Sequence, residues 1–225
     1  MTTLEFQPHQ LTPEQVFRFL PHGNSNPSSR QRLLATIDSV QTEFKTRRIM
    51  ARLGLFRCKV TDSQLMFPEE HYKIDCDTYY LMGASLVAML VTTVQPELDS
   101  FCTDMYKQGR YIEALVVDTV GTAQLNAVIC RIRNRLSHHL KSLKVGYTLS
   151  PGANKLPIET QNIIFDALRP AETIGAKLTP SLQMTPLKSI SALIPFGVGL
   201  NCLASTANSC EICEYRHKCY ASACS

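Results

Sequence analysis

The longest run of helical periodicity, between Tyr111 and Leu143, constrains the fold more than any other part of the chain. Apolar side chains recur there at intervals of three and four residues, which is typical of a helix with one buried face. These residues are Leu115, Val116, Val120, Leu125, Val128, Ile129, Ile132, Leu136, Leu140 and Leu143. Gly121, in the middle of the run, predicts either close packing or a break in the helix.

A second apolar stretch, from Tyr79 to Val94, predicts a strand. Its residues are small or β-branched and alternate poorly, as expected of a strand buried on both faces. It is shorter than the roughly 20 residues that span a bilayer, and Pro96 ends it, so we expect core and no membrane segment. With 225 residues, 44% of them hydrophobic, the chain can build one sizeable α+β domain.

Shorter elements follow from local signals. Thr12, Pro13 and Gln15 have the pattern of a capping box with proline in the first helical turn, which predicts a helix start. The further predicted elements are helices over 33–53, 96–107 and 157–168, and strands over 174–179 and 188–195.

Charge says little about partners. The net charge is +4, and we expect most of the basic residues of the long helical run to lie on its solvent side, although such a row could also meet phosphates. This row comprises Arg131, Arg133, Arg135, His138, His139, Lys141 and Lys144. We expect no nucleic-acid partner.

Cysteines gather at the end of the chain. The N-terminus lacks the pattern of a signal peptide, so we expect a cytoplasmic, reducing setting in which the nine cysteines form no disulfides. Cys210 and Cys213 form a Cys-x2-Cys pair, and Cys219 can close on the same metal. Cys202 is the preferred fourth ligand, and Cys224 is the alternative.

The cysteine spacing favours iron–sulfur over zinc. All-thiolate ligands with irregular spacing suit a [4Fe–4S] cluster, whereas zinc usually takes two paired knuckles. Zinc and merely clustered thiols remain open, and the Cys-x3-Cys-x2-Cys spacing of radical enzymes is absent. The four isolated cysteines predict core packing. These are Cys58, Cys76, Cys102 and Cys130.

Two stretches carry a family resemblance. SPGANKLPIETQNIIFDAL (150–168) and IGAKLTPSLQMTPLKSISALI (174–194) resemble, in order and spacing, the activation (reactivation) domain of cobalamin-dependent methionine synthase, and YKQGRYIEALVVDTVGTAQLNAV (106–128) resembles its helical segment in free-standing proteins. The resemblance covers most of residues 4–200. It implies an α+β fold with helices around a mixed or antiparallel sheet over residues 1–200, followed by a cysteine-rich tail over 201–225.

The resemblance also implies a function. In that family the domain caps an oxidised cobalamin while an electron and a methyl group from S-adenosylmethionine restore the cofactor. The implied partners are a corrinoid-dependent methyltransferase protein and an electron donor such as ferredoxin or flavodoxin. Ser150, Pro151 and Gly152 match the family's Pro-Gly turn and are the expected cofactor-binding residues.

Four positions depart from the family pattern. Thr148 stands at the arginine position, Ala153 at the tyrosine, Asn126 at the helix glutamate, and Pro180 at the acidic residue after Leu-Thr. Replacing an arginine that grips a carboxylate should cost about 2 kcal/mol of ligand binding. The S-adenosylmethionine site is therefore expected to be altered.

Two functions remain open. The first is an activation partner of a corrinoid protein, in which an iron–sulfur cluster in the tail relays electrons to cobalt. The second is a non-catalytic binding or assembly module, in which the tail is a structural metal knot and the cleft is degenerate.

Overall fold

A five-stranded antiparallel sheet organises the molecule. The computed structural model describes residues 1–20, 27–95, 97–201 and 212–214. The strand order is β1-β2-β6-β10-β7, and every neighbouring pair is antiparallel. The strands are β1 (Thr2–Phe6), β2 (Ile49–Arg57), β6 (Leu86–Val94), β10 (Ser189–Gly197) and β7 (Lys144–Val145). The predicted α+β class is confirmed, and the sheet is antiparallel rather than mixed.

The central strand β6 has a buried face on each side, as its composition predicts, but it begins at Leu86 and not at Tyr79. Ala88, Leu90 and Val94 face the first hydrophobic cluster, whereas Val87 and Met89 face the second. Eight of the nine residues of β6 are buried. Alternation along the strand therefore supplies two cores from one element.

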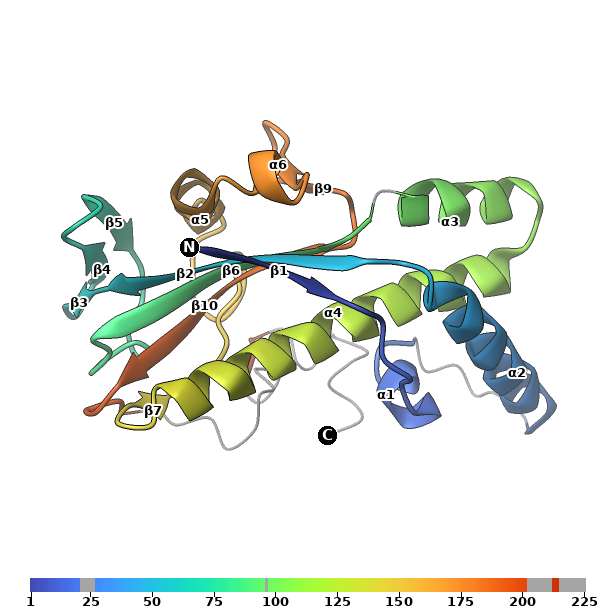
Figure 1. Cartoon of the computed structure of the whole chain (residues 1–225), viewed down its shortest axis with the longest axis horizontal. Helices are drawn as coiled ribbons and strands as arrows, with labels where there is room; N and C mark the ends of the chain where they lie inside the picture. Colours follow the sequence, from blue (N-terminus) through green and yellow to red (C-terminus); the bar gives the residue numbers. More distant parts are fainter. Residues whose placement is uncertain (21–26, 96, 202–211, 215–225) are drawn as a thin grey trace.

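Helices cover one face of the sheet (Figure 1). The helix α4 (Tyr111–His139) crosses this face, and α1 (Pro13–Phe17), α2 (Pro27–Phe44) and α3 (Glu97–Lys107) pack beside it in the first cluster. Gly121 does not break α4. A side-chain Cβ at Gly121 would lie 2.9 Å from Leu98 Cδ2 of α3, so the glycine permits close packing.

The length and composition of α4 would also allow it to cross a membrane. However, 61% of its apolar window is buried inside the molecule. This burial is what a core helix requires, because its apolar face packs on the sheet.

Smaller elements cover the other face. They are α5 (Thr160–Leu168), α6 (Pro170–Thr173), the three-stranded sheet β3-β4-β5 and the hairpin β8-β9. Their bounds are β3 (Lys59–Val60), β4 (Gln64–Phe67), β5 (Tyr72–Asp75), β8 (Lys177–Leu178) and β9 (Met184–Thr185). Figure 1 shows α5 and α6 on the opposite side of the sheet from α4.

The predicted helix over 33–53 is wrong in its second half. The helix α2 ends at Phe44, and Ile49–Arg57 forms β2, paired with β6 from Ile49↔Val94 to Arg57↔Leu86. Ile49, Ala51 and Leu53 are buried on one face. Their period of two is masked in the sequence by Met50 and Phe56 on the other face, where Phe56 packs in the second cluster.

Other predicted boundaries shift. The strand predicted over 174–179 shrinks to β8, and the one over 188–195 matches β10 within two residues. The helix predicted from residue 157 begins at Thr160, while the helix over 96–107 matches α3. The capping box is confirmed, since Gln15 N–H donates to Thr12 Oγ1 at 3.3 Å and Thr12 N–H donates to Gln15 Oε1 at 2.8 Å.

Candidate functional site

The Ser150–Gly152 turn begins where the chain leaves the edge of the main sheet. Leu149 pairs with Leu193 of β10 through two backbone hydrogen bonds of 2.8 Å. The turn follows immediately, and the buried side chains of Leu149 and Leu156 anchor both ends of the loop in the second hydrophobic cluster. The sheet edge therefore positions the turn.

Hydrogen bonds within the loop determine which backbone N–H groups of the turn remain free to bind a ligand. Gly152 has φ +81°, a conformation that favours glycine, and its N–H donates to Leu156 O at 2.9 Å. Ala153 N–H donates to Ser150 O at 3.0 Å, and Ser150 N–H donates to Asn154 Oδ1 at 3.4 Å. Three backbone donors are thus used internally, which leaves no N–H at these positions for an anion.

Three of the four replaced positions, those that in the family hold the ligand, contribute no charge. Thr148 is 6% exposed and its Oγ1 is buried, and Asn126 donates its Nδ2–H to Thr122 O on its own helix. Ala153 adds only a methyl group. In addition, α4, which carries Asn126, packs in the first cluster, whereas Leu149 and Leu156 belong to the second, on the opposite face of the sheet.

Polar atoms without partners lie around the turn. In the described part of the chain, four side-chain atoms here are buried and form no hydrogen bond: Thr148 Oγ1, Asn154 Nδ2, Thr160 Oγ1 and Gln161 Oε1. Each of these residues is more than nine-tenths buried. Such atoms are normally satisfied by water or by a ligand, so the loop retains unused polar capacity even though it lacks charge.

One described part of the cysteine-rich tail lies against this loop. Ile212 packs on the second hydrophobic cluster, Cys213 is a half-buried free thiol, and Glu214 Oε1 accepts a hydrogen bond of 3.4 Å from Lys155 N–H. The structure therefore brings the Cys213 segment and the loop after the turn together. Their sequence separation of about 60 residues contains no signal for this contact.

An ion pair and aromatic rings border the same loop. Lys155 Nζ lies 2.7 Å from Asp77 Oδ2, and this contact raises the pKa of Lys155 and lowers that of Asp77. The Tyr80 ring lies 5.1 Å from Tyr79 and 5.9 Å from Tyr147, in both cases edge to face. No local pattern in the sequence singles out this ion pair or these tyrosines.

The predicted metal ligands are only partly described. Cys202, Cys210 and Cys219 lie outside the described residues, so Cys213 alone can be placed. Among residues 1–20, 27–95, 97–201 and 212–214, no group of three or more His, Cys, Asp or Glu side chains is arranged to hold a metal ion. The metal site stays a prediction.

The isolated cysteines are protected by burial. Cys58 is 8% exposed and packs in the second cluster, which confirms its predicted role in the core. Desolvation raises the pKa of Cys58 to about 12 and the pKa values of Cys76 and Cys102 to about 11. A thiol with so high a pKa is a poor nucleophile and metal ligand at neutral pH.

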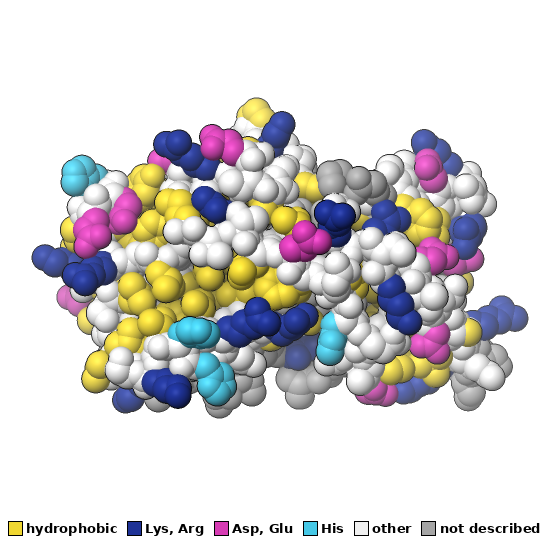
Figure 2. Space-filling view, viewed as in Figure 1, with side chains coloured by type: hydrophobic (Ala, Val, Ile, Leu, Met, Phe, Trp, Pro, Cys, Tyr) yellow, Lys and Arg dark blue, Asp and Glu magenta, His cyan; other side chains and the backbone are white. Residues whose placement is uncertain are grey.

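Most of the basic row is exposed, as the sequence predicts. The exception is Arg133, which is 5% exposed and whose Nη2–H donates to Gly146 O at 3.5 Å. Arg131 and Arg135 stand over the Phe6 ring at 5.2 and 6.0 Å. Figure 2 shows basic and histidine side chains gathered where α4 lies in Figure 1, beside a hydrophobic band. These arginines therefore serve packing as well as charge.

Comparison with known proteins identifies the fold. No family model matches the chain, and no curated protein matches its sequence. Among solved structures, the crystal structure of the MetH reactivation domain bound to AdoHcy is similar with a TM-score of 0.65 and 13% sequence identity, over 92% of this chain and 81% of that chain. The likeness establishes that nearly the whole chain has the fold of that reactivation domain.

Proposed function

We propose that this protein is an activation partner of a corrinoid-dependent methyltransferase of the methionine synthase type. The similarity of fold to a MetH reactivation domain over 92% of the chain carries this proposal. The Pro-Gly turn supports it, because this motif occupies a partly exposed loop at a sheet edge, where it could approach a partner's cofactor. In this role the domain docks on the corrinoid-binding module and limits the access of water to the cobalt.

The tail would supply the electron. Cys202, Cys210, Cys213 and Cys219 are the proposed thiolate ligands of a [4Fe–4S] cluster, and the placement of Cys213 beside the turn supports a cluster near the docking surface. When bound, such a cluster passes single electrons from a donor such as ferredoxin or flavodoxin. A cytoplasmic, reducing compartment would keep these thiols available.

The residues at the turn do not fit S-adenosylmethionine held in the family's manner. The buried hydroxyl of Thr148 replaces a guanidinium, and Asn126 bonds to its own helix. The backbone donors of Ser150, Gly152 and Ala153 are used within the loop. We therefore assign this chain docking and electron delivery, and no methyl transfer from S-adenosylmethionine.

The test begins with anaerobically purified protein. We expect about four irons and four sulfides per chain and an EPR signal after reduction, and we expect both to be lost in Cys213→Ser but retained in the control Cys130→Ser. The wild-type protein should then accelerate reduction of cob(II)alamin on a corrinoid methyltransferase, followed by absorbance. Zinc in place of iron, or no acceleration by an iron-loaded protein, contradicts the proposal.

A second candidate function is a non-catalytic binding or assembly module with a structural metal knot. The uncharged turn at Thr148 and Ala153 favours it, because nothing at these positions can grip a charged ligand. On this reading, S-adenosylmethionine gives no heat on titration, and metal chelation lowers thermal stability without changing any electron-transfer rate.

A further inference from the structure

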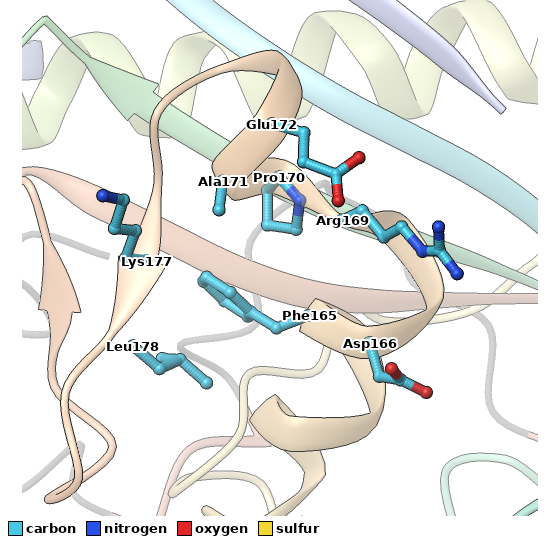
Figure 3. Close-up of a pocket in the computed structure, with 8 residues that line it drawn as sticks. All are labelled: Phe165, Asp166, Arg169, Pro170, Ala171, Glu172, Lys177 and Leu178. Carbon is cyan, nitrogen blue, oxygen red and sulfur yellow. The ribbon is translucent and has the colours of Figure 1, made fainter.

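A cleft beside the junction of α5 and α6 combines opposite charges with an apolar floor. Two adjoining cavities of about 510 and 470 Å³ share Asp166, Arg169 and Glu172. Figure 3 shows these three side chains extending to the same side, away from Lys177. On that side, Glu70 and Tyr72 complete the rim of the 470 Å³ cavity, and Phe56 and Leu168 also line it.

Four of these groups form one electrostatic cluster. Tyr72 O–H donates to Asp166 Oδ2 at 2.5 Å, and this bond is the main cause of a raised pKa for Tyr72. The charges of Arg169 and Glu70 also act on the Tyr72 hydroxyl, in opposite directions. An arginine and a second carboxylate therefore lie close enough to act on the Tyr72–Asp166 pair, and all four groups line the 470 Å³ cavity.

Arg169 is held in an unusual conformation, and its side chain has no partner within the described part of the chain. Its φ of +47° and ψ of +54° place it in the left-handed region, where glycine is normally found at the end of a helix. Its guanidinium forms no ion pair or hydrogen bond with any residue that the structure describes. Strain of this kind is common where a side chain must point at a ligand.

Arg52, the other arginine that lines the cleft, differs from Arg169 because its guanidinium is hydrogen-bonded within the fold. Its Nε–H donates to Leu168 O at 3.1 Å and its Nη1–H donates to Thr3 Oγ1 at 2.9 Å. Arg52 thus caps the end of α5 and ties it to β1. Its guanidinium is engaged in the structure, whereas that of Arg169 is available.

The negative side of the cleft is also unsatisfied. Glu70 Oε2 is buried and has no hydrogen-bond partner among the described residues. A buried carboxylate oxygen without a donor is costly, and a ligand ammonium would satisfy it. Glu172 likewise forms no ion pair within the described ranges.

We propose that this cleft binds a free α-amino acid with an apolar side chain. The ligand carboxylate pairs with the Arg169 guanidinium, the ammonium pairs with Glu70, and the side chain lies against Met1 and Phe56, which line the same cavity. A simple anion would meet Glu70, Asp166 and Glu172, and a simple cation would meet Arg169, so the mixed charges select a zwitterion. Neither the Ser150–Gly152 turn nor the described residues 212–214 line this cleft.

Ligand chemistry provides the first test. L-Leucine is the probe, and two analogues each lack one charge: 4-methylpentanoate without the ammonium and 3-methylbutylamine without the carboxylate. Calorimetric titration of the full chain, with amide NMR shifts to locate the site, should show L-leucine binding and shifts around Tyr72 and Arg169, with each analogue at least about tenfold weaker. Equal binding of an analogue, or no binding of L-leucine, overturns the proposal.

Variants provide the second test. Arg169→Gly suits the left-handed backbone, so it should fold normally while weakening L-leucine binding at least about tenfold, and Glu70→Gln should weaken it by a similar factor. Arg110→Gln, at the α3–α4 turn, is the matched control and should bind as the wild type does. Unchanged binding in Arg169→Gly, with a melting curve like that of the wild type, excludes the proposed site. Because the iron content and the cobalamin assay do not involve this cleft, its failure is distinguishable from failure of the proposed function.

Discussion

At the scale of single residues, backbone geometry restricts some positions to glycine. Gly83 has φ +83°, and a Cβ placed on it would lie 1.8 Å from Gly199 O. Gly197 would place its own Cβ 2.1 Å from Gly83 O. The entry to β6 and the exit from β10 therefore meet through glycine backbones, without room for a methyl group.

Gly83→Ala should lower the free energy of unfolding by about 3 kcal/mol or more, because a backbone clash adds to the cost of a left-handed alanine. Gly109→Ala is the matched control: it has φ +75° but nothing within 4 Å of its Cβ. It should cost only about 1 kcal/mol. Urea unfolding followed by circular dichroism measures both, and equal losses would show that the close approach is unimportant.

Cysteine ionisation yields a prediction about pH. With pKa values of about 12 for Cys58 and about 11 for Cys76 and Cys102, only about one thiol in 1,000 or fewer is ionised at pH 8. Iodoacetamide should therefore label these residues in the native protein far more slowly than in urea. Mass spectrometry after timed quenching measures the difference, and rapid native labelling of Cys58 contradicts the burial argument.

The same pKa shifts affect stability. A thiol ionises near pH 8.5 in the unfolded chain but near 11 or 12 in the folded one. The folded state therefore binds more protons between these values, so its stability is complete below about pH 8.5 and falls as the pH rises through the folded pKa values. The urea midpoint should decline above pH 9, and Cys58→Ala should make that decline shallower.

At the scale of elements, a short helix depends on its cap. The helix α1 has five residues, with Val16 fully buried, and its first turn is closed by reciprocal bonds between Thr12 and Gln15. A helix this short is not stable alone. Its cap and its packing must therefore act together.

Thr12→Ala should cost about 1 kcal/mol of unfolding free energy through loss of the cap. Thr36→Ala, in α2, is the control, because Thr36 Oγ1 is exposed and bonds only to Arg32 O of its own helix. It should change stability by less than about 0.5 kcal/mol. Equal effects in thermal melts would contradict the assigned role of the cap.

At the scale of the whole molecule, two buried glutamines hold the segment after β1. Gln41 of α2 accepts from Leu11 N–H at 2.7 Å and donates to Leu11 O at 3.1 Å. Gln124 of α4 makes the same pair of bonds with His9, at 3.1 and 2.6 Å. Each side-chain amide makes the pair of backbone hydrogen bonds that a neighbouring strand would otherwise make. Together the two glutamines hold this segment against α2 and α4.

Gln124→Ala should lower the free energy of unfolding by about 2–3 kcal/mol, because it leaves both backbone groups of His9 without partners. Gln183→Ala, at an exposed turn where Gln183 forms hydrogen bonds to described residues only through its backbone, is the control and should be nearly neutral. Urea unfolding and amide hydrogen exchange at His9 and Leu11 provide the measurement. An unchanged hydrogen-exchange rate at the His9 amide would contradict the assigned role of Gln124 in holding this segment.

Hydrophobic periodicity predicted the helices that bury one face and the strand that is buried on both faces. The run from Tyr111 is α4, the apolar stretch before Pro96 ends in β6, and the capping box begins α1. It did not predict β2, because apolar residues on its other face hide the period of two, nor β3, β4 and β5, which are short and depend on their neighbours. The turn at Ser150–Gly152 was predicted from its own residues. The internal hydrogen bonds that occupy its backbone N–H groups were not predicted.

Local composition alone thus determined the α+β class, the long helix, the Pro-Gly turn and the clustering of thiols, because these depend on neighbouring residues. Contacts between distant segments required the tertiary structure: Glu214 on Lys155, Gln124 on His9, and Tyr72 on Asp166. Such pairs are separated by 59–115 residues, and no local pattern encodes which polar groups meet across that distance. The cleft at Arg169 also required the tertiary structure. Its polar and charged residues come from a strand, a loop and a helix, and they form one site only because folding brings these elements together.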